Sequence, residues 1–250
     1  MSIAIITGGS RGLGRSMALH LADKGTDVIF TYRSQRGAAE DVVREIEQRG
    51  RKALALPLDV ADIGSFDGFA STVRDALEAE WGRRDFDFLV NNAGIGKHVP
   101  FMETTSGDVD ELVSIHFKGP FFLTQKLVPL MRDGGRVLNV SSGLTRFSTP
   151  GASVYAAMKG AMEVLTRYQA KELGPRGIIV NVLAPGAIET DFNGGLVRDN
   201  EEVNRFIAGV TALGRAGQPD DIGRAAAALL VDEGGWINGQ RIEASGGMFL

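Results

Sequence analysis

A tyrosine and a lysine four residues apart are the first residues in this chain whose spacing indicates chemistry. Tyr155 and Lys159 lie in V-Y-A-A-M-K-G-A-M-E-V-L, a run with a helical composition, so both side chains should share one helix face. An unperturbed tyrosine has a pKa near ~10, about three units too high for proton exchange at neutral pH. A neighbouring ammonium should lower that pKa. A shift of three units corresponds to roughly 4 kcal/mol, which would require a second positive charge nearby. The alternative is an exposed helix that carries this pair by chance.

The composition favours one large globular domain. The 250 residues are 44% hydrophobic and 23% charged, and a chain of this length can bury roughly three quarters of its unfolded surface. A net charge of -4 argues against nucleic acid as a partner. The chain has no cysteine, which excludes disulfides, cysteine-ligated zinc and thiol nucleophiles, and we expect no metal site.

The sequence also favours a cytoplasmic location. The opening M-S-I-A-I-I-T has neither a basic region nor a long apolar run, so we expect no signal peptide. No segment approaches the ~18 apolar residues of a membrane span, and we expect no membrane association.

A glycine-rich segment follows the first predicted strand. The β-branched run at residues 3–7 leads into T-G-G-S-R-G-L-G and then into an amphipathic helix that ends near residue 24. Backbone N–H groups and the helix dipole would form an anion site there. The spacing of Gly8, Gly12 and Gly14 differs from the G-x-G-x-x-G dinucleotide fingerprint, so a purely structural glycine turn is the alternative.

The second predicted strand, residues 27–32, ends without an acid. In dinucleotide-binding folds, an acid at this point binds the ribose 2′-hydroxyl, whereas an arginine accepts a 2′-phosphate. Here Arg33 and Ser34 follow the strand, and Arg11 of the glycine loop could face the same point. This favours NADP over NAD, the alternative being two solvated surface arginines.

Strands and helices alternate along the remainder of the chain. We expect strands at 3–7, 27–32, 52–58, 86–90, 135–140, 178–183 and 240–243, and helices that include 37–50, 63–80, 106–131, 153–173 and 220–231. The alternation predicts an α/β, single-domain, doubly wound Rossmann fold, with a parallel sheet of about seven strands and helices on both faces. A Lys-Gly-Pro break at 118–120 should kink or restart the long helix. The irregular, glycine-spotted segment 192–217 is a candidate substrate lid.

Polar or small residues follow most of these strands. Asp59 could accept a hydrogen bond from an adenine or cap the helix that begins near residue 63. The segment N-N-A-G (91–94) suits backbone contact with a cofactor, although a bare turn has the same composition. Because ligands bind at the carboxyl ends of the strands in such folds, these motifs should meet in one place.

The motifs together resemble those of the short-chain dehydrogenase/reductase family, in its form of about 250 residues, over the whole chain. T-G-x-x-x-G-x-G, D-V after the third strand, N-N-A-G, S-S, Y-x-x-x-K and P-G-x-x-x-T occur in that order. The resemblance implies an NADP(H)-dependent oxidoreductase acting on a small-molecule carbonyl or secondary alcohol. It also implies a single NADP-binding domain (1–250), a lid at about 187–217 and a homotetramer.

The resemblance implies roles for a tetrad, of which three members match. Tyr155 would be the general acid or base, Ser142 would hydrogen-bond the substrate oxygen, and Lys159 would bind the nicotinamide ribose and lower the pKa of Tyr155, assisted by the nicotinium charge. The fourth position, usually asparagine, holds His116. The family role of that residue is to hold a helix kink whose backbone carbonyl binds a water, which any side chain permits. We therefore expect His116 to be a tolerated substitution, the alternative being a working member of the proton relay.

The remaining contacts carry over in the same way. The resemblance assigns to cofactor binding Gly8, Ser10, Arg11, Gly12, Leu13, Gly14, Arg33, Ser34, Asp59, Val60, Asn92, Ala93, Gly94, Pro185, Gly186, Ile188 and Thr190. The expected substrate-lining residues are Ile95, His98, Leu144, Arg146, Phe147, Ala187 and Phe192, with Phe206 on the lid. They describe a mixed apolar pocket with one or two polar groups.

Two further functions remain open. The 3-oxoacyl-[acyl-carrier-protein] reductases are near relatives, but Asp133, in the predicted turn 131–134, is an acid where that subgroup usually has basic residues for the carrier. This favours a small-molecule ketone. The presence of His116 leaves a catalytically weak NADP-binding sensor or scaffold as an alternative of another class.

Overall fold

A seven-stranded parallel sheet forms the centre of the protein. The structure is a computed structural model and describes residues 1–231 and 234–250. The strand order is β3-β2-β1-β4-β5-β6-β7, and each neighbouring pair is parallel. The strands are Ser2–Ile6 (β1), Thr26–Tyr32 (β2), Ala53–Pro57 (β3), Phe86–Asn91 (β4), Met131–Val140 (β5), Ile179–Pro185 (β6) and Arg241–Ala244 (β7). The predicted doubly wound α/β fold is confirmed, with the order of strands reversing between β1 and β4.

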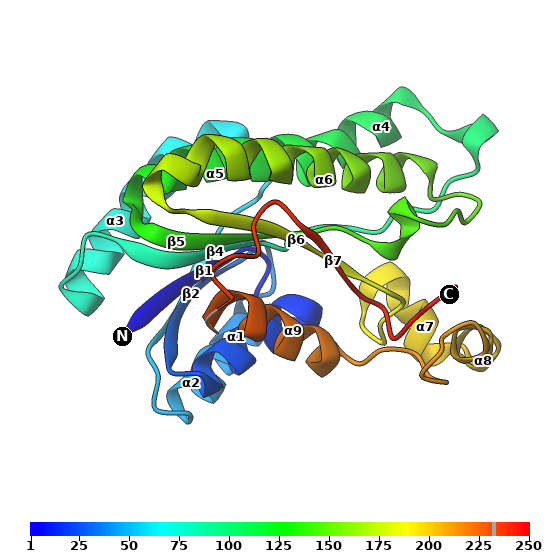
Figure 1. Ribbon diagram of the computed structural model, residues 1–250, viewed down its shortest axis with the longest axis horizontal. Helices are drawn as coiled ribbons and strands as arrows, with labels where there is room; N and C mark the ends of the chain where they lie inside the picture. Colours follow the sequence, from blue (N-terminus) through cyan, green and yellow to red (C-terminus); the bar gives the residue numbers. More distant parts are fainter. Residues whose placement is uncertain (232–233) are drawn as a thin grey trace.

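Helices cover both faces of the sheet (Figure 1). They are Gly12–Asp23 (α1), Arg36–Glu47 (α2), Phe66–Trp81 (α3), Ser106–Val113 (α4), Gly119–Leu127 (α5), Ser153–Leu173 (α6), Leu196–Asp199 (α7), Glu201–Gly209 (α8) and Pro219–Val231 (α9). The group α1, α2 and α9 lies below the sheet in Figure 1, and α5 and α6 lie above it. Helices α7 and α8 lie apart from both layers, beside the C-terminus.

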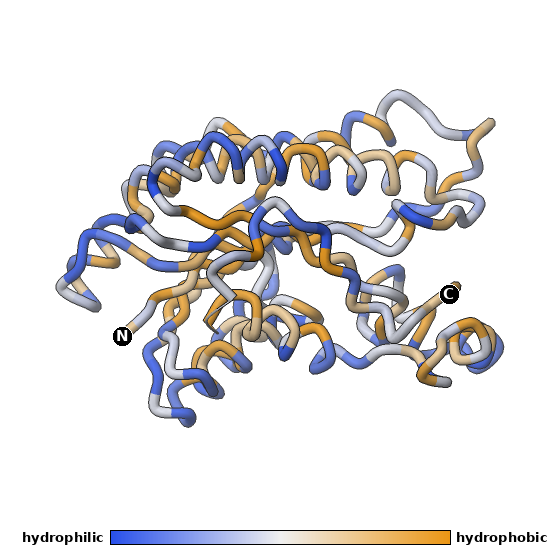
Figure 2. Tube along the Cα trace, in the orientation of Figure 1, coloured by the Kyte–Doolittle hydropathy of each residue, from blue (hydrophilic) through white to orange (hydrophobic). Residues whose placement is uncertain are grey.

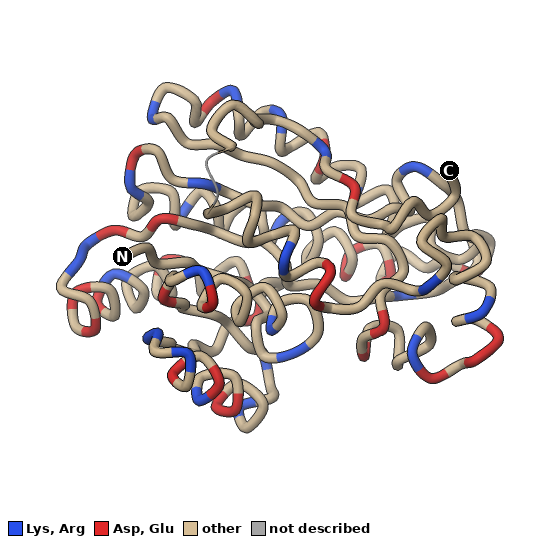
Figure 3. The backbone as a smooth tube through the Cα atoms, turned by 60° about the horizontal axis from the view of Figure 1, so that its bottom comes forward, with Lys and Arg blue, Asp and Glu red and all other residues tan. Residues whose placement is uncertain are grey.

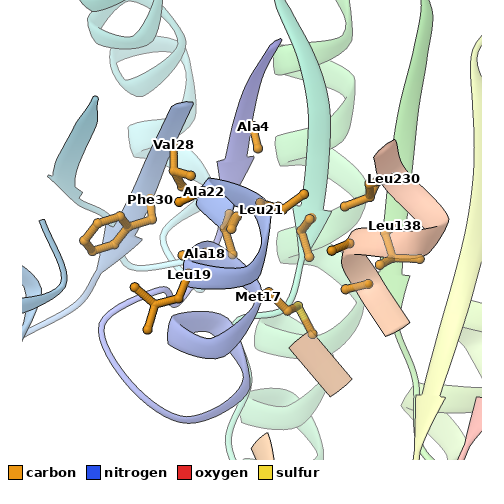
Figure 4. Packing of buried hydrophobic residues seen from close by; sticks show 14 of the residues in the cluster. Ala4, Met17, Ala18, Leu19, Leu21, Ala22, Val28, Phe30, Leu138 and Leu230 are labelled. Atoms are coloured by element: carbon orange, nitrogen blue, oxygen red, sulfur yellow. The ribbon is translucent and has the colours of Figure 1, made fainter. Parts of the chain in front are cut away.

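Two hydrophobic clusters hold these layers together, one on each face of the sheet. The central strands are largely hydrophobic in sequence (Figure 2). Met17 and Leu21 of α1 lie beneath the sheet with Phe30 of β2 and Leu230 of α9 (Figure 4). On the other face, α3 and α5 pack against alternate residues of the same strands. Strands buried on both sides must be apolar throughout, which explains the continuous I-A-I-I run of β1.

The long helix predicted at 106–131 is interrupted. It consists of α4, a π-helical turn at Ser114–Lys118 and α5, followed by a 3-10 turn at Val128–Leu130. The break therefore begins just before the predicted Lys-Gly-Pro position, and Pro120 occupies the first turn of α5, where a missing N–H costs no hydrogen bond. The π-turn contains His116. The predicted restart is confirmed, and the π-helical turn is the feature that separates α4 from α5.

Residues 132–135 bulge out of the sheet, because Met131 of β5 pairs with Phe86 and Arg136 pairs with Phe88, and Gly134 has a positive φ of 75°. The turn expected at 131–134 is thus present as a bulge within β5 and not as a turn before it. A second expectation is wrong. The segment 192–217 is not irregular throughout, because it contains a 3-10 turn at Phe192–Gly195 and the helices α7 and α8.

Charged residues are distributed without a dominant sign in the view of Figure 3, where basic and acidic positions are interspersed along the helices. The helices of the described chain are all too short or too polar to cross a lipid bilayer.

Candidate active site

A cavity of about 440 Å³ lies where the strand-end motifs meet. Its walls contain residues from the glycine loop, from the ends of β2 to β6 and from the segment after β6. Every expected cofactor residue contributes to these walls, as do Ser142, Tyr155, Lys159 and His116. The carboxyl ends of neighbouring parallel strands share one edge of the sheet, which is why motifs so distant in sequence converge.

Helix α6 presents Tyr155 and Lys159 on one face, as the four-residue spacing predicts. The Lys159 ammonium is buried and lies 5.5 Å from the centre of the Tyr155 ring. It donates one hydrogen bond, of 2.9 Å, to the carbonyl oxygen of Val140 at the end of β5. An ammonium has three N–H donors, so, as far as the described residues go, two remain for a ligand in the cavity.

Without a bound cofactor, burial dominates the pKa of Tyr155, and the lowering expected from Lys159 together with a nicotinium charge stays a prediction. Burial raises the pKa of Tyr155 to about 12, and a hydrogen bond with Ser142 opposes this only in part. Burial also lowers the pKa of Lys159 to about 8, because an apolar environment disfavours its charged form. At neutral pH the phenol therefore keeps its proton, and most of the lysine keeps its charge.

Ser142 is held beside Tyr155 by the loop that follows β5. Its Oγ accepts a 3.2 Å hydrogen bond from the backbone N–H of Leu144, which leaves the hydroxyl proton free to point at Tyr155. Glu163 of α6 fixes this loop, because its Oε1 accepts hydrogen bonds from Ser141 Oγ (2.8 Å) and Thr145 Oγ1 (2.7 Å). Sequence reasoning missed Glu163, although its position one turn after Lys159 on the same helix face could have indicated it.

His116 lies in the cavity wall with its ring edge-on to Tyr155, at a centroid distance of 5.2 Å. Its Nε2 is 2.9 Å from the carbonyl oxygen of Ile95 and 3.4 Å from the Ile95 backbone nitrogen; because the carbonyl contact is shorter and a carbonyl can only accept, we assign the ring proton to Nε2. Among the described residues Nδ1 has no hydrogen-bond partner. Burial, together with the charge of Lys159, lowers the pKa of His116 to about 3. The imidazole is therefore neutral throughout the physiological pH range.

Two positions of the glycine loop, Gly8 and Gly14, do not tolerate a side chain. A Cβ at Gly14 would lie 2.1 Å from the carbonyl oxygen of Gly8, and Gly8 itself has a positive φ of 69°. The Asn92 amide secures the loop by donating to the carbonyl oxygens of Thr7 (2.9 Å) and Gly8 (3.2 Å). The backbone of this loop is thus exposed to the cavity at the start of α1, where an anion is stabilised.

Two unpaired guanidinium groups lie at the far end of the cavity. Arg11 and Arg33 both contribute to its walls, and neither guanidinium has a hydrogen bond or ion pair within the part of the chain that the structure describes. Ser34 lies beside them in the wall. By contrast, Asp59 accepts a 2.9 Å hydrogen bond from the N–H of Ala61 and so shapes a local turn; it does not cap the next helix.

Three expected substrate-lining residues lie outside the cavity walls. His98 is exposed and packs against Gly151, whereas Arg146 binds Glu243 through two hydrogen bonds of 2.7 and 2.9 Å. Phe206 is 59% exposed on α8, near Phe249. A charged partner 97 residues away draws Arg146 out of the site, which no local pattern could indicate.

Other lining residues were not expected. Five of them are Thr149, Asn193, Leu196, Val197 and Met248. The first four lie in the loop after β5 and in the segment after β6, both already suspected of contacting substrate. Met248, near the C-terminus, also lines the cavity, and no sequence pattern indicates that it should.

Comparison with known proteins shows likeness over nearly the full length. A family model described as enoyl-(acyl carrier protein) reductase matches residues 8–249. The 3-oxoacyl-[acyl-carrier-protein] reductase FabG of Staphylococcus aureus is 35% identical over 249 residues, covering 99% of this chain and 98% of that protein.

Two solved structures are also similar. LugOII, described as a promiscuous reductase that catalyses keto-reduction at C1 during lugdunomycin biosynthesis, has a TM-score of 0.93 and 36% identity, covering 98% of this chain and 96% of its own. A short chain dehydrogenase from Burkholderia cenocepacia in complex with NADP has a TM-score of 0.90 and 34% identity, covering 98% of this chain and 97% of its own.

Proposed function

The chain belongs to the short-chain dehydrogenase/reductase family, and from this premise we propose that it is an NADPH-dependent oxidoreductase acting on the carbonyl group, or the secondary alcohol, of a small molecule. The observation that carries the proposal is the meeting of Ser142, Tyr155 and Lys159 in the wall of one cavity, with a protonated phenol and two unused lysine donors. A tyrosine with its pKa raised to about 12 is a proton donor at neutral pH, which suits carbonyl reduction.

The roles of these residues follow from their environments. The Tyr155 O–H gives its proton to the substrate oxygen, and the Ser142 O–H hydrogen-bonds the same oxygen while negative charge develops on it. Lys159 uses its free N–H donors to hold the ribose hydroxyls. NADPH, when bound, supplies the hydride. The Val140 carbonyl orients Lys159, and the Glu163 network orients the serine loop.

The cavity fits NADP(H) in three respects. The close-packed glycine loop presents backbone N–H groups for the pyrophosphate. Arg11 and Arg33 are unpaired among the described residues and can accept a 2′-phosphate, with Ser34 beside them. Asp59 and Val60 would contact the adenine; Asn92, Ala93 and Gly94 the adenosine side; and Pro185, Gly186, Ile188 and Thr190 the carboxamide. The NADP complex of the Burkholderia relative supports the same cofactor here.

The likeness to FabG makes a carrier-bound 3-oxoacyl chain the second candidate substrate. An ion pair argues against it. Asp133 in β5 binds the Arg176 guanidinium at 2.7 Å, and Arg132 is paired with the buried Asp87 at 3.0 Å. Both arginines are therefore already paired with a carboxylate, which reduces their attraction for an acidic carrier.

A ketone panel tests the proposed function. The purified protein is incubated with NADPH and with free ketones, and separately with an acetoacetyl group on acyl-carrier protein, while NADPH absorbance is followed. We expect turnover of at least one free ketone and weaker turnover of the carrier-bound substrate. Efficient use of the carrier-bound substrate alone would favour the second candidate. Tight NADP(H) binding without turnover would favour the sensor or scaffold.

The His116→Asn variant should keep activity within about tenfold and leave the pH profile between pH 6 and 7 unchanged. The reason is that a histidine with a pKa near 3 is already neutral there. A lost or shifted limb in that range would show that the imidazole relays protons.

The same substitution should change acid stability. The pKa of His116 is about 3 in the folded protein, whereas the ordinary value of 6.5 applies once the chain unfolds. As pH falls through 6.5, the unfolded chain therefore gains a proton and the folded protein does not. His116 makes the folded state progressively less stable between pH 6.5 and 3. Denaturant unfolding at pH 7 and pH 5 should show a smaller loss of stability in His116→Asn than in the parent.

We expect a homo-oligomer, most simply a tetramer. Helices α5 and α6 carry apolar side chains that the monomer leaves partly or largely exposed, including Phe121, Phe122, Leu165 and Val164 (46% exposed). Sedimentation at micromolar concentration should show a species several times the 26.7 kDa of the chain. A profile with monomer alone would contradict the expectation.

A further inference from the structure

The aromatic ring of Phe192 lies close to Tyr155. It belongs to the 3-10 turn Phe192–Gly195, just beyond the end of β6. The two ring centroids are 5.9 Å apart with an interplanar angle of 56°, and Phe192 is 41% exposed. A ring that borders the proton donor and still has free surface can contact a bound substrate directly.

Gly96, in the loop after β4, is in close contact with this turn, and we call this contact the seat. A Cβ at Gly96 would lie 1.5 Å from Asn193 Oδ1 and 2.9 Å from Phe192 Cε1. Asn193 makes the contact from a left-handed backbone conformation, with φ of 53°. The absence of a side chain at Gly96 thus lets the turn approach the opposite loop, and this contact fixes where Phe192 lies.

The base of the turn is tied to the segments around it. The two carboxylate oxygens of Glu189 accept hydrogen bonds from Asn204 Nδ2 and Gln218 Nε2, each of 2.6 Å. Arg198 binds Asp199 at 2.7 Å and also binds Asp191. Phe192 is therefore held from two sides, by these bonds and by the seat at Gly96.

The substrate end of the cavity is mostly apolar, with Thr149, Asp191 and Asn193 as polar members of its wall. Six of its lining residues are Ile95, Leu144, Phe147, Leu196, Val197 and Met248. Phe147 is itself braced by Phe249, at a centroid distance of 4.7 Å.

The cations near this end are already paired. Lys97 binds Asp108 and Glu111, each at 2.6 Å, and Arg146 binds Glu243 at 2.7 Å. Arg198 is occupied by the two aspartates described above. These three cations are thus occupied, and Lys159, whose remaining donors are assigned to the ribose, is the other cation of the described residues beside Tyr155. An anionic group brought to the substrate end would therefore lose its hydration with little compensation.

We propose that this site takes uncharged, planar aromatic ketones and that Phe192 selects them by packing its ring against theirs. The inference rests on the proposed carbonyl reduction and specifies its substrate class. An aromatic ring gains more from a second aromatic ring than a saturated ring of equal size does, because the two quadrupoles attract in offset or edge-on arrangements. The seat at Gly96 sets the space in which this packing occurs.

Three related ketones test the proposal in the full-length protein with NADPH. They are 1-tetralone, the saturated 1-decalone with the same ring skeleton, and a tetralone that carries a carboxylate on its aromatic ring. The parent should prefer 1-tetralone over each of the others by about tenfold or more in kcat/KM. In Phe192→Leu, kcat/KM for 1-tetralone should fall by roughly fivefold while that for 1-decalone changes little. Phe101→Leu, at a residue 77% exposed and outside the cavity walls, is the matched control and should change neither.

The Gly96→Ala variant tests the seat separately. Its methyl group must displace Asn193 and Phe192, so KM for 1-tetralone should rise severalfold while the affinity for NADPH stays the same. The proposal is overturned if the parent reduces 1-decalone or the carboxylate as efficiently as 1-tetralone. It is also overturned if Phe192→Leu lowers kcat/KM for all three substrates equally. If NADPH is oxidised by other ketones but not by 1-tetralone, the substrate class is wrong and the proposed function stands. If no ketone is reduced, both fail.

Discussion

Tyr155→Phe should lose about 10²–10⁴ in kcat for carbonyl reduction, the range typical of general acid catalysis. The substitution removes a single oxygen atom, and with it the proton that the pKa of about 12 keeps in place at neutral pH. Because the ring remains, its contacts with His116 and Phe192 should persist. Steady-state rates with NADPH and a turned-over ketone measure the effect, and NADPH affinity should remain close to that of the parent.

The matched control is Tyr168→Phe. Tyr168 lies on the same helix but is 63% exposed and outside the cavity walls, so its hydroxyl should be dispensable. If Tyr155→Phe kept more than a tenth of the parent rate, another group would have to supply the proton. The assignment of the general acid would then be wrong.

Arg33→Ala should weaken NADPH binding by about 10- to 150-fold, corresponding to the roughly 1.5–3 kcal/mol of a charge-assisted hydrogen bond. Arg33 lines the cavity and, among the described residues, has no competing partner to satisfy its guanidinium. NADH lacks the 2′-phosphate, so its affinity should change little. Titration of the parent and the variant with each nucleotide gives both values.

Arg36→Ala provides the control for Arg33. This neighbouring arginine is exposed and pairs with Glu40 at 2.8 Å, outside the cavity walls. It should leave both affinities unchanged. NADPH binding by Arg33→Ala as tight as that of the parent would refute the assignment of this contact.

The elements that depend on local pattern could be predicted from the sequence. The four-residue spacing of Tyr155 and Lys159 is sufficient to place both on one helix face, and the alternation of strands and helices is sufficient to bring the glycine loop to the same edge of the sheet. The fold class follows from the same alternation. These inferences do not require knowledge of which side chains form hydrogen bonds or ion pairs with one another in the folded protein.

Features that depend on distant partners could not be predicted. Arg146 leaves the site because Glu243 offers a bidentate partner across the fold. Gly96 and Asn193 meet although about 100 positions separate them, and only the close approach explains why a glycine stands there. The raised pKa of Tyr155 depends on the burial of its side chain, and this burial cannot be inferred from the spacing of Tyr155 and Lys159 in the sequence.

Deuterium transfer tests the central proposal most directly. The parent protein is given NADPH deuterated at the transferable position of the nicotinamide together with a neutral ketone, and the alcohol is analysed by mass spectrometry and NMR. Our account predicts that the deuterium appears on the former carbonyl carbon, in one configuration, and that Tyr155→Phe forms the same product at least about 10²-fold more slowly. Tight NADPH binding with no labelled alcohol from any ketone would contradict it and would favour a nucleotide-binding sensor or scaffold.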